Sequence, residues 1–151
     1  MSYIIEKLLP KNYEKCNNIW EMNKFPERTR QWYDEFVSGN RIIFVYIEND
    51  EYLGEASLVF KNNDSDYTIP NKRIYLSRMI VKAEYRNKGI GNIILNFLID
   101  YAKSLGYEEI SLSVDISNVG ARWLYEKNGF INTIFVGEDK DGKYVKLVKI
   151  L

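Results

Sequence analysis

Two glycines and a basic residue stand close together in the middle of the chain, in the segment YRNKGIG at residues 85–91. Arg86 is followed by Gly89 and Gly91, between the apolar run IYLSRMIVK and the apolar stretch NIILNFLIDYA. A helix that begins at about residue 89 leaves its first amides without intrahelical partners and carries a partial positive charge at that end. Glycines there let a ligand approach the backbone, so the segment is suited to a phosphate or pyrophosphate group.

Two common phosphate-binding motifs do not fit this segment. A P-loop needs Gly-Lys-Ser/Thr after four spacer residues, whereas residues 91–93 read GNI. A dinucleotide-binding fold needs a third glycine three residues after Gly91, where this chain has Ile94. A plain surface turn is the alternative explanation. If a phosphate does bind, Arg86 and Lys88 would add charge-assisted hydrogen bonds.

The composition narrows the class of protein. The chain has 151 residues, of which 46% are hydrophobic, and this predicts one compact domain over residues 1–151. Lys+Arg and Asp+Glu are equal at 21 each, so no overall charge favours nucleic acid or an anionic membrane as a partner. No apolar run is long enough to span a membrane, and the start MSYIIEKLLPK does not resemble a signal peptide. The single cysteine, Cys16, cannot form an internal disulfide, so we expect a cytoplasmic protein.

The absence of histidine from the sequence limits the possible chemistry. It excludes Ser-His and Cys-His nucleophilic catalysis and any His-ligated zinc site, so no metal cofactor is expected. Proton transfer must rely on Tyr, Asp, Glu, Lys, Ser, backbone amides and water.

Hydrophobic periodicity and turn residues divide the chain into seven strands and four helices. The strands are expected at residues 2–9, 41–48, 52–60, 74–81, 108–116, 131–137 and 144–151. The helices are expected at residues 11–24, 28–38, 89–105 and 118–128. This order predicts an α/β fold with a mixed, mostly antiparallel central sheet of about seven strands and helices on both faces.

Two segments of the chain resemble the GNAT superfamily of N-acetyltransferases. MIVKAEYRNKGIGNIILNFLIDYAKSLG is similar to the segment whose Arg-x-x-Gly-x-Gly binds the coenzyme A pyrophosphate. SVDISNVGARWLYEKNGF is similar to a second family motif, here Asn118, Ala121, Tyr125, Gly129 and Phe130. The resemblance implies a GNAT-like fold and acetyl-CoA as cosubstrate. It also implies transfer of the acetyl group to a primary amine by direct attack in a ternary complex.

The resemblance implies which residues hold the cosubstrate. Backbone groups of Met79, Ile80 and Val81 would bond the pantetheine arm and polarise the thioester carbonyl. Asn118 would bond the same arm. The expected set is completed by the pyrophosphate loop and the second motif, namely Arg86, Asn87, Lys88, Gly89, Ile90, Gly91, Asn92, Ala121 and Tyr125.

Tyr125 occupies the family's general-acid position, although it could equally be one of twelve tyrosines packed in a core. A phenol with a pKa of about 10 can protonate a departing thiolate with a pKa of about 8.5. The general base is less defined, because the positions where some family members carry a glutamate are Tyr75, Ser77 and Ser113 here. Glu55 on the preceding strand could act through a water molecule, or it could be a solvent-facing strand residue. An acceptor amine of low pKa would need no base.

The acceptor side is expected at the two N-terminal helices and the loop at residues 61–72. An aromatic wall could form there from Trp20, Phe25, Trp32 and Tyr33, although core packing would explain the same helical spacing. Acidic residues on these elements could attract a cationic small-molecule amine such as a polyamine or an aminoglycoside, namely Glu27, Asp34, Glu35, Asp64 and Asp66.

Three functions are compatible with this sequence, and a small-molecule N-acetyltransferase is preferred. The second is an enzyme of the same fold that acetylates protein or peptide amines. The third is a non-catalytic acyl-CoA-binding module, which the lack of an obvious base keeps open, since Asp115 is a weaker candidate than Glu55. The apolar last strand, with Val145, Leu147 and Ile150, could pair or pack at a homodimer interface.

Overall fold

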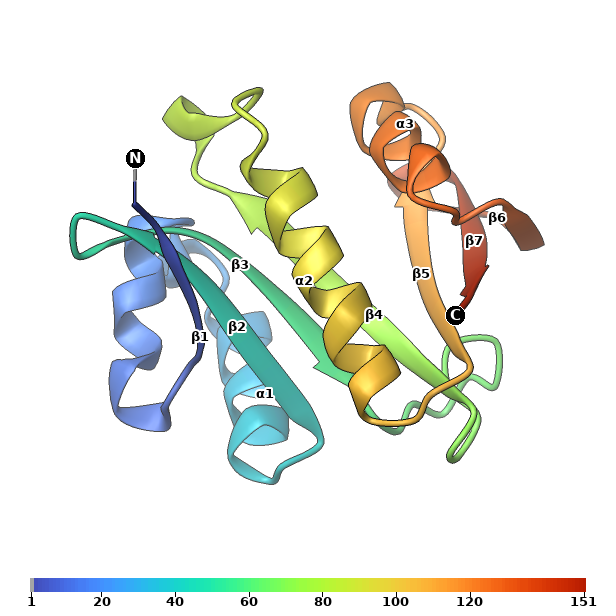
Figure 1. Cartoon of the computed structure of the whole chain (residues 1–151), viewed down its shortest axis with the longest axis horizontal. Coiled ribbons are helices and arrows are strands. Elements are labelled where there is room, and N and C mark those ends of the chain that lie inside the picture. The colour runs from blue at the N-terminus through green and yellow to red at the C-terminus, as the bar shows by residue number, and fades with distance from the viewer. Residues whose placement is uncertain (1) are drawn as a thin grey trace. The chain divides into compact units, whose positions relative to one another are not determined.

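The computed structural model describes residues 2–151, with the elements in the predicted order (Figure 1). These residues group into two compact units. The first unit comprises Met1–Val59 and Arg78–Leu98, and the second comprises Phe60–Ser77 and Ile99–Leu151. Strand β4 (Arg73–Val81) and helix α2 (Ile90–Ser104) each continue from one unit into the other.

Three strands of the first unit form an antiparallel meander, namely β1 (Ile4–Lys7), β2 (Arg41–Glu48) and β3 (Glu51–Val59). Strands β2 and β3 are joined by a two-residue turn, as the acidic sequence NDE predicted. Asn49 and Asp50 adopt positive φ angles of 50° and 63° there. Such angles are characteristic of the turns that match the twist of a hairpin.

A β-bulge and a glycine set how α2 packs on this hairpin. The register of β2 shifts between Tyr46 and Ile47, and Gly54 of β3 lies opposite Tyr46. A Cβ added at Gly54 would lie only 2.8 Å from Ile94 Cδ1 of α2, so the glycine permits close contact between helix and strand. The sequence suggested a bulge at residues 74–81, and that suggestion stays a prediction.

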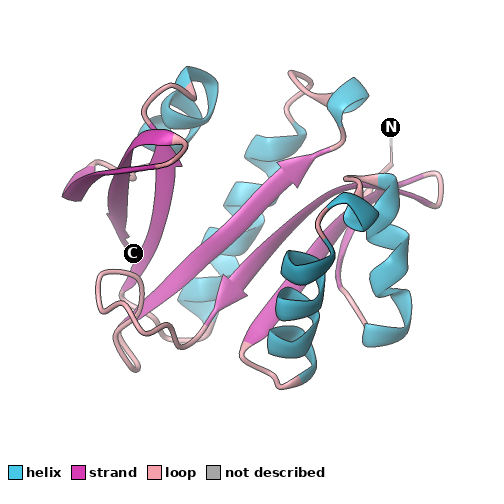
Figure 2. Ribbon diagram, turned by 180° about the vertical axis from the view of Figure 1, so that it is seen from behind, coloured by secondary structure: helices cyan, strands magenta, loops and turns pink. Residues whose placement is uncertain are grey.

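Helices cover both faces of the β1–β3 sheet (Figure 2). One face carries two 3₁₀ helices, η1 (Pro10–Asn18) and η2 (Met22–Lys24), and helix α1 (Pro26–Val37). The N-terminal part of α2 lies on the other face. Buried side chains form the core beneath η1, η2 and α1, namely Leu8, Tyr13, Cys16, Ile19, Met22, Phe36, Ile43, Val45, Ile47 and Tyr52.

The single helix expected at residues 11–24 is instead two 3₁₀ helices. Two asparagine side chains hold the segment in this form, since one takes the backbone N–H of Met22 and the other bonds to strand β3. Asn17 Oδ1 accepts a hydrogen bond from Met22 N at 3.1 Å, and Asn18 Nδ2 donates to Tyr52 O at 2.8 Å. The predicted apolar face nevertheless points inward.

Helix α2 begins at Ile90, between the two glycines of the segment and close to the predicted start, and Gly106 follows its end with a φ of 88°. The predicted helix at residues 89–105 ends one residue earlier, because Leu105 follows the final helical residue and is exposed. The buried face consists of Ile90, Ile94, Leu95, Leu98, Ile99 and Ala102. Within residues 2–151 no helix combines the length and the apolar character needed to cross a bilayer.

The second unit contains β5 (Glu109–Asp115), α3 (Val119–Lys127), β6 (Asn132–Asp139) and β7 (Gly142–Ile150). The first half of β4 pairs with β5 in parallel, and the pairs β5–β7 and β7–β6 are antiparallel. The seven strands follow the order β1-β2-β3-β4-β5-β7-β6. The predicted mixed, mostly antiparallel sheet is therefore confirmed.

The last strand does not have the free edge that a strand-pairing interface would need. β7 pairs with β5 on one side and with β6 on the other, so packing rather than edge pairing is the form in which this strand could meet a second copy. Val145 and Leu147 are buried inside the unit. Ile150 of β7 is exposed, and β6 carries further exposed apolar side chains, at Ile134, Phe135 and Val136. A homodimer of another kind stays a prediction.

Candidate functional site

The loop before α2 presents its backbone to solvent. It follows the short 3₁₀ helix η3 (Ala83–Tyr85), and its four residues from Arg86 to Gly89 are all exposed. Ile93 N donates to Gly89 O at 3.2 Å, so Gly89 already takes part in the first turn of the helix, whose earliest amides point toward the loop. The loop and the positive end of the helix together form a site suited to an anion.

The shape of this loop depends on two left-handed residues. Asn87 and Gly89 have φ angles of 63° and 86°. A Cβ added at Gly89 would meet no atom within 4 Å, so backbone conformation rather than space favours glycine there. Arg86 Nε donates to Val81 O at 3.0 Å and ties the loop to the end of β4. This bond uses one of the five N–H donors of the guanidinium.

The backbone predicted to hold pantetheine lies in the second half of β4. Met79, Ile80 and Val81 are all half-buried. The carbonyl of Val81 already accepts the bond from Arg86 Nε. We therefore expect pantetheine to bond to the other backbone N–H and C=O groups of this segment. Lys82 N donates to Leu53 O at 2.8 Å and so fixes the end of β4 against β3.

Glu55 is buried, and the alternative that it faces solvent was wrong. The residue is 3% exposed, and its Oε1 lies 3.5 Å from Arg78 Nε. Burial raises the pKa of Glu55 above its ordinary value, and the charge of Arg78 and a bond from Cys16 oppose this rise. Burial also raises the pKa of the Cys16 thiol, so Cys16 is neutral at pH 7. A carboxyl with a raised pKa is suited to accept a proton near neutral pH.

Two tryptophans enclose the guanidinium of Arg78. The Arg78 Cζ atom lies 4.1 Å from the ring centroid of Trp20 and 4.4 Å from that of Trp32. The two rings meet edge to face at 5.6 Å, and Phe25 lies 6.4 Å from Trp20. Three of the four residues of the predicted aromatic wall are therefore grouped together. Sequence analysis missed Arg78, although a lone arginine in an apolar strand indicates a specific partner.

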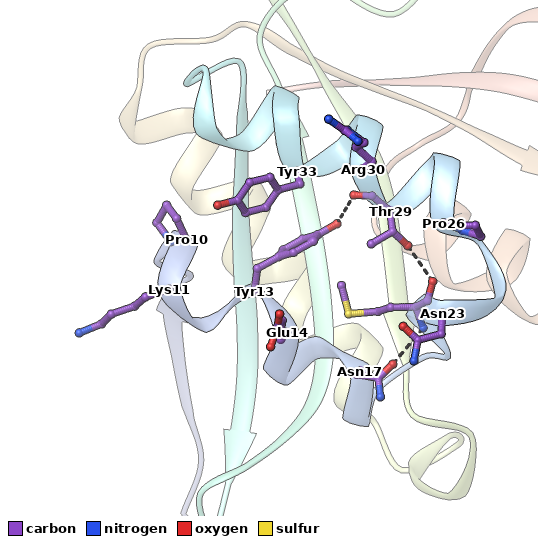
Figure 3. Close-up of a pocket in the computed structure, with 11 residues that line it drawn as sticks. Pro10, Lys11, Tyr13, Glu14, Asn17, Asn23, Pro26, Thr29, Arg30 and Tyr33 are labelled. Carbon is purple, nitrogen blue, oxygen red and sulfur yellow. Dashed lines mark hydrogen bonds between the residues drawn. The ribbon is translucent and has the colours of Figure 1, made fainter.

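The fourth aromatic residue, Tyr33, lines a pocket of about 880 Å³ bounded by η1, η2 and α1 (Figure 3). Its ring lies 5.0 Å from that of Tyr13, whose hydroxyl donates to Thr29 O at 2.8 Å. Burial raises the pKa of Tyr13 to about 12. The pocket arises from the 3₁₀ geometry of η1, which the sequence did not predict. Its charged lining residues are Lys11, Glu14 and Arg30.

Most of the acidic residues expected to attract a cationic acceptor are already paired. In the first unit, Glu35 Oε2 lies 2.8 Å from Arg41 Nη2. In the second unit, Lys146 Nζ donates to Asp64 Oδ2 at 2.7 Å and to Asp66 Oδ2 at 3.0 Å. Three of the five predicted acids thus have a cationic partner within the chain, and attraction of a cationic acceptor by these residues stays a prediction.

The second predicted motif begins with a helix cap. Asn118 Oδ1 accepts a hydrogen bond from Ala121 N at 3.2 Å and caps α3. The Nδ2 group of Asn118 is the part of the side chain that can donate to a ligand. Gly129 follows the helix with a φ of 96°, and a Cβ added there would lie 2.6 Å from Lys149 Nζ. The left-handed conformation therefore favours glycine at this position, whereas the lysine end can move to make space.

Tyr125 lies in α3 and is 7% exposed. Its ring contacts that of Phe130 edge to face, with centroids 5.9 Å apart. Burial raises the pKa of Tyr125 to about 12, so the phenol is fully protonated at pH 7. The residue is packed in a core, which is one of the two interpretations drawn from the sequence. It also carries the proton that a general acid must be able to donate.

The predicted site residues fall into two groups. The loop, the end of β4 and Glu55 belong to the first unit, and Asn118, Ala121 and Tyr125 belong to the second. The first group comes from β3, β4 and the loop before α2, which are distant in sequence. The second group comes from α3 and its cap, and its members belong to one motif. The roles assigned to them stay predictions.

A sequence model described as the acetyltransferase (GNAT) family matches residues 5–130. N-alpha-acetyltransferase 30 of Schizosaccharomyces pombe is 26% identical over 127 residues, which cover 84% of this chain and 73% of that protein. N-acetyltransferase 8 of Homo sapiens is 31% identical and the uncharacterized N-acetyltransferase YhfO of Bacillus subtilis is 33% identical. These two matches cover 45% and 59% of this chain, and they span only 30% and 58% of those proteins' own lengths.

Solved structures share the fold at low identity. The ribosomal-protein-S18-alanine N-acetyltransferase of Escherichia coli has a TM-score of 0.78 and 21% identity over 99% of this chain and 94% of its own. An aminoglycoside 6'-acetyltransferase type Ii has a TM-score of 0.77 and 18% identity over 97% and 96%. The PaiA N-acetyltransferase of Thermoplasma acidophilum, solved in complex with coenzyme A, has a TM-score of 0.70 and 21% identity over 100% of both chains.

Proposed function

This chain belongs to the acetyltransferase (GNAT) family, and on that basis we propose that it acetylates a primary amine of a small molecule with acetyl-CoA. The reaction is direct attack of the amine on the thioester within a ternary complex. The observation that carries the proposal is the exposed loop from Arg86 to Gly89 at the start of α2, which suits the pyrophosphate of coenzyme A. The coenzyme A complex of a structural neighbour supports the same cosubstrate.

The chain's own groups bind and orient the cosubstrate. Arg86 and Lys88 add charge-assisted bonds to the pyrophosphate, beside the amides at the start of α2. Backbone groups of Met79 and Ile80 bond the pantetheine arm, and Asn118 Nδ2 donates to it. Acetyl-CoA supplies the activated acetyl group as a thioester.

Two side chains donate and accept protons during the acetyl transfer. Tyr125 gives its phenolic proton to the departing sulfur, because its raised pKa keeps the phenol protonated at pH 7. Glu55 receives the proton of the acceptor amine. Its carboxylate is too deeply buried for direct contact with an amine, so the proton passes through a water molecule.

Acetylation of a protein or peptide amine is the second candidate. The relative named N-alpha-acetyltransferase 30, which covers most of this chain, favours it, whereas the aminoglycoside 6'-acetyltransferase among the structural neighbours favours a small molecule. Turnover of acetyl-CoA with a panel of free amines and a panel of short peptides separates the two. Turnover with neither panel would leave the third candidate, a non-catalytic acyl-CoA-binding module.

Thermal unfolding with acetyl-CoA, coenzyme A, NADH and ATP tests the cosubstrate directly. We expect stabilisation by the first two only, by about 2.7 kcal/mol at a hundred times the dissociation constant. Gly91→Glu is the control, because it places a carboxylate at the helix start and should abolish the shift. The absence of a shift with both acetyl-CoA and coenzyme A would overturn the proposal.

A further inference from the structure

Four residues of the first unit form an arginine–tryptophan cluster, namely Arg28, Arg78, Trp20 and Trp32. Arg78 lies between the two indole rings, as described above. Arg28 Cζ lies 5.7 Å from the ring centroid of Trp32 and 5.6 Å from that of Phe25. Guanidinium groups stacked on aromatic faces keep their N–H donors in plane, where they can bind a carboxylate with two bonds.

The cluster carries an excess of positive charge. Arg78 faces the carboxyl of Glu55, and Arg41, 5.5 Å from the ring centroid of Trp32, pairs with Glu35. Arg28 is exposed, and no carboxylate of residues 2–151 lies within ion-pair distance of it. One positive charge is therefore uncompensated at the solvent side of the cluster.

Two buried donors in the cluster lack an acceptor within the described part of the chain. They are Trp20 Nε1 and Arg78 Nε, which both face the carboxyl of Glu55 and lower its pKa, although neither contact meets hydrogen-bond geometry. A buried N–H without an acceptor costs about 1–3 kcal/mol, so such atoms are rare in folded proteins. Their presence beside an uncompensated arginine indicates a site for a ligand with anionic oxygens.

We propose that the acceptor amine also carries a carboxylate, and that Arg28 and Arg78 bind this group in the arginine–tryptophan cluster. The proposal rests on the proposed acetyltransferase function and names the class of its acceptor. It replaces the cationic acceptor suggested by the sequence, since Glu35 is compensated by Arg41. The carboxylate can come from a free acidic amino compound or from the side chains of an acidic peptide, and both present the same chemistry.

Binding can be measured without turnover by tryptophan fluorescence. The exposed Trp123 is replaced by Phe, so that Trp20 and Trp32 are the reporters. The probes are glutamate, glutamine and lysine, and the peptides Ser-Glu-Glu, Ser-Gln-Gln and Ser-Lys-Lys. We expect a fluorescence change with an acidic probe at a concentration at least tenfold lower than with its neutral or basic counterpart. The better acidic probe identifies the source of the carboxylate.

Arg28→Gln is expected to remove this preference, and Arg30→Gln is the matched control. Both arginines are exposed residues of α1, but Arg30 lines the pocket of Figure 3 instead of the cluster. A preference for lysine, no preference at all, or equal behaviour of the two variants would overturn the proposal. The thermal shift with acetyl-CoA, measured on the same variants, reports separately on the proposed function. Turnover should then show the same tenfold preference in kcat/KM.

Discussion

Burial of Tyr125 contributes to the free energy of unfolding, and this contribution is lost at alkaline pH. Burial raises the pKa of its phenol to about 12, compared with about 10 in an unfolded chain. The folded state therefore holds the proton more tightly than the unfolded state does. This contribution is fully present below pH 10 and is lost as the pH rises from 10 through 12.

The size of the effect follows from the difference of about two pKa units, which corresponds to about 2.7 kcal/mol when the loss is complete. At pH 11 roughly nine-tenths of the unfolded phenol and one-tenth of the folded phenol are ionised, so about 1.4 kcal/mol is lost relative to pH 8. Tyr125→Phe removes this titration. Tyr13 and Tyr46, whose pKa values are also raised to about 12, titrate in both proteins and cancel in the comparison.

Urea denaturation of the wild type and of Tyr125→Phe at pH 8 and pH 11, followed by circular dichroism, measures this difference. Between the two pH values the wild type should lose about 1.4 kcal/mol more than the variant. Equal losses would refute the argument that burial of this phenol raises its pKa. The catalytic role is tested separately at pH 7, where the variant should lose on the order of a hundredfold in kcat. A fall of less than twofold would contradict the assignment of Tyr125 as the acid.

Two further variants test local features of the fold. Gly89→Ala causes no clash in the loop but places an alanine in a left-handed conformation. The variant should therefore lose about 1–2 kcal/mol of unfolding free energy in urea denaturation and bind acetyl-CoA more weakly. Unchanged stability would contradict the role of the φ angle. The pair Asp64→Asn and Asp66→Asn leaves the buried Lys146 uncompensated, whereas Lys146→Met leaves two partly exposed carboxylates. The double asparagine variant should therefore be the less stable one in thermal unfolding, and the reverse order would refute the reasoning.

The elements that the sequence predicted well are those that local interactions determine. The start of α2 follows from the glycine segment, and its end follows from Gly106 in a left-handed conformation. The cap of α3 by Asn118 follows from a single side chain and a backbone amide three residues later. The segment at residues 11–24 was mistaken for an α-helix because hydrophobic spacing alone does not include bonds such as that from Asn18 to Tyr52, 34 positions away.

The site residues that the sequence indicated stay predictions, but the structure shows surroundings of these residues that the sequence did not. The sequence identified Glu55, but not that it is buried beside Arg78, because the two residues lie on different strands. A charged residue in a strand can face solvent or a buried partner, and only the tertiary fold decides between these. The acidic residues expected to attract a cation raise the same difficulty, since the partner of Asp64 lies 82 positions away.

The charge of the acceptor site therefore depends on which charges are left over after pairing. Counting acids on the N-terminal helices predicted a cationic substrate, but pairing with Arg41 removes Glu35 from that count, and Arg28 lies beside the ring of Trp32 without an ion-pair partner among the described residues. The ring of Trp32 contacts the guanidinium groups of both Arg28 and Arg78, at 5.7 Å and 4.4 Å from its centroid. In such a setting a carboxylate gains more from an arginine than it would in bulk water. An acidic acceptor is the class of substrate for which this arrangement of charges and rings provides binding energy.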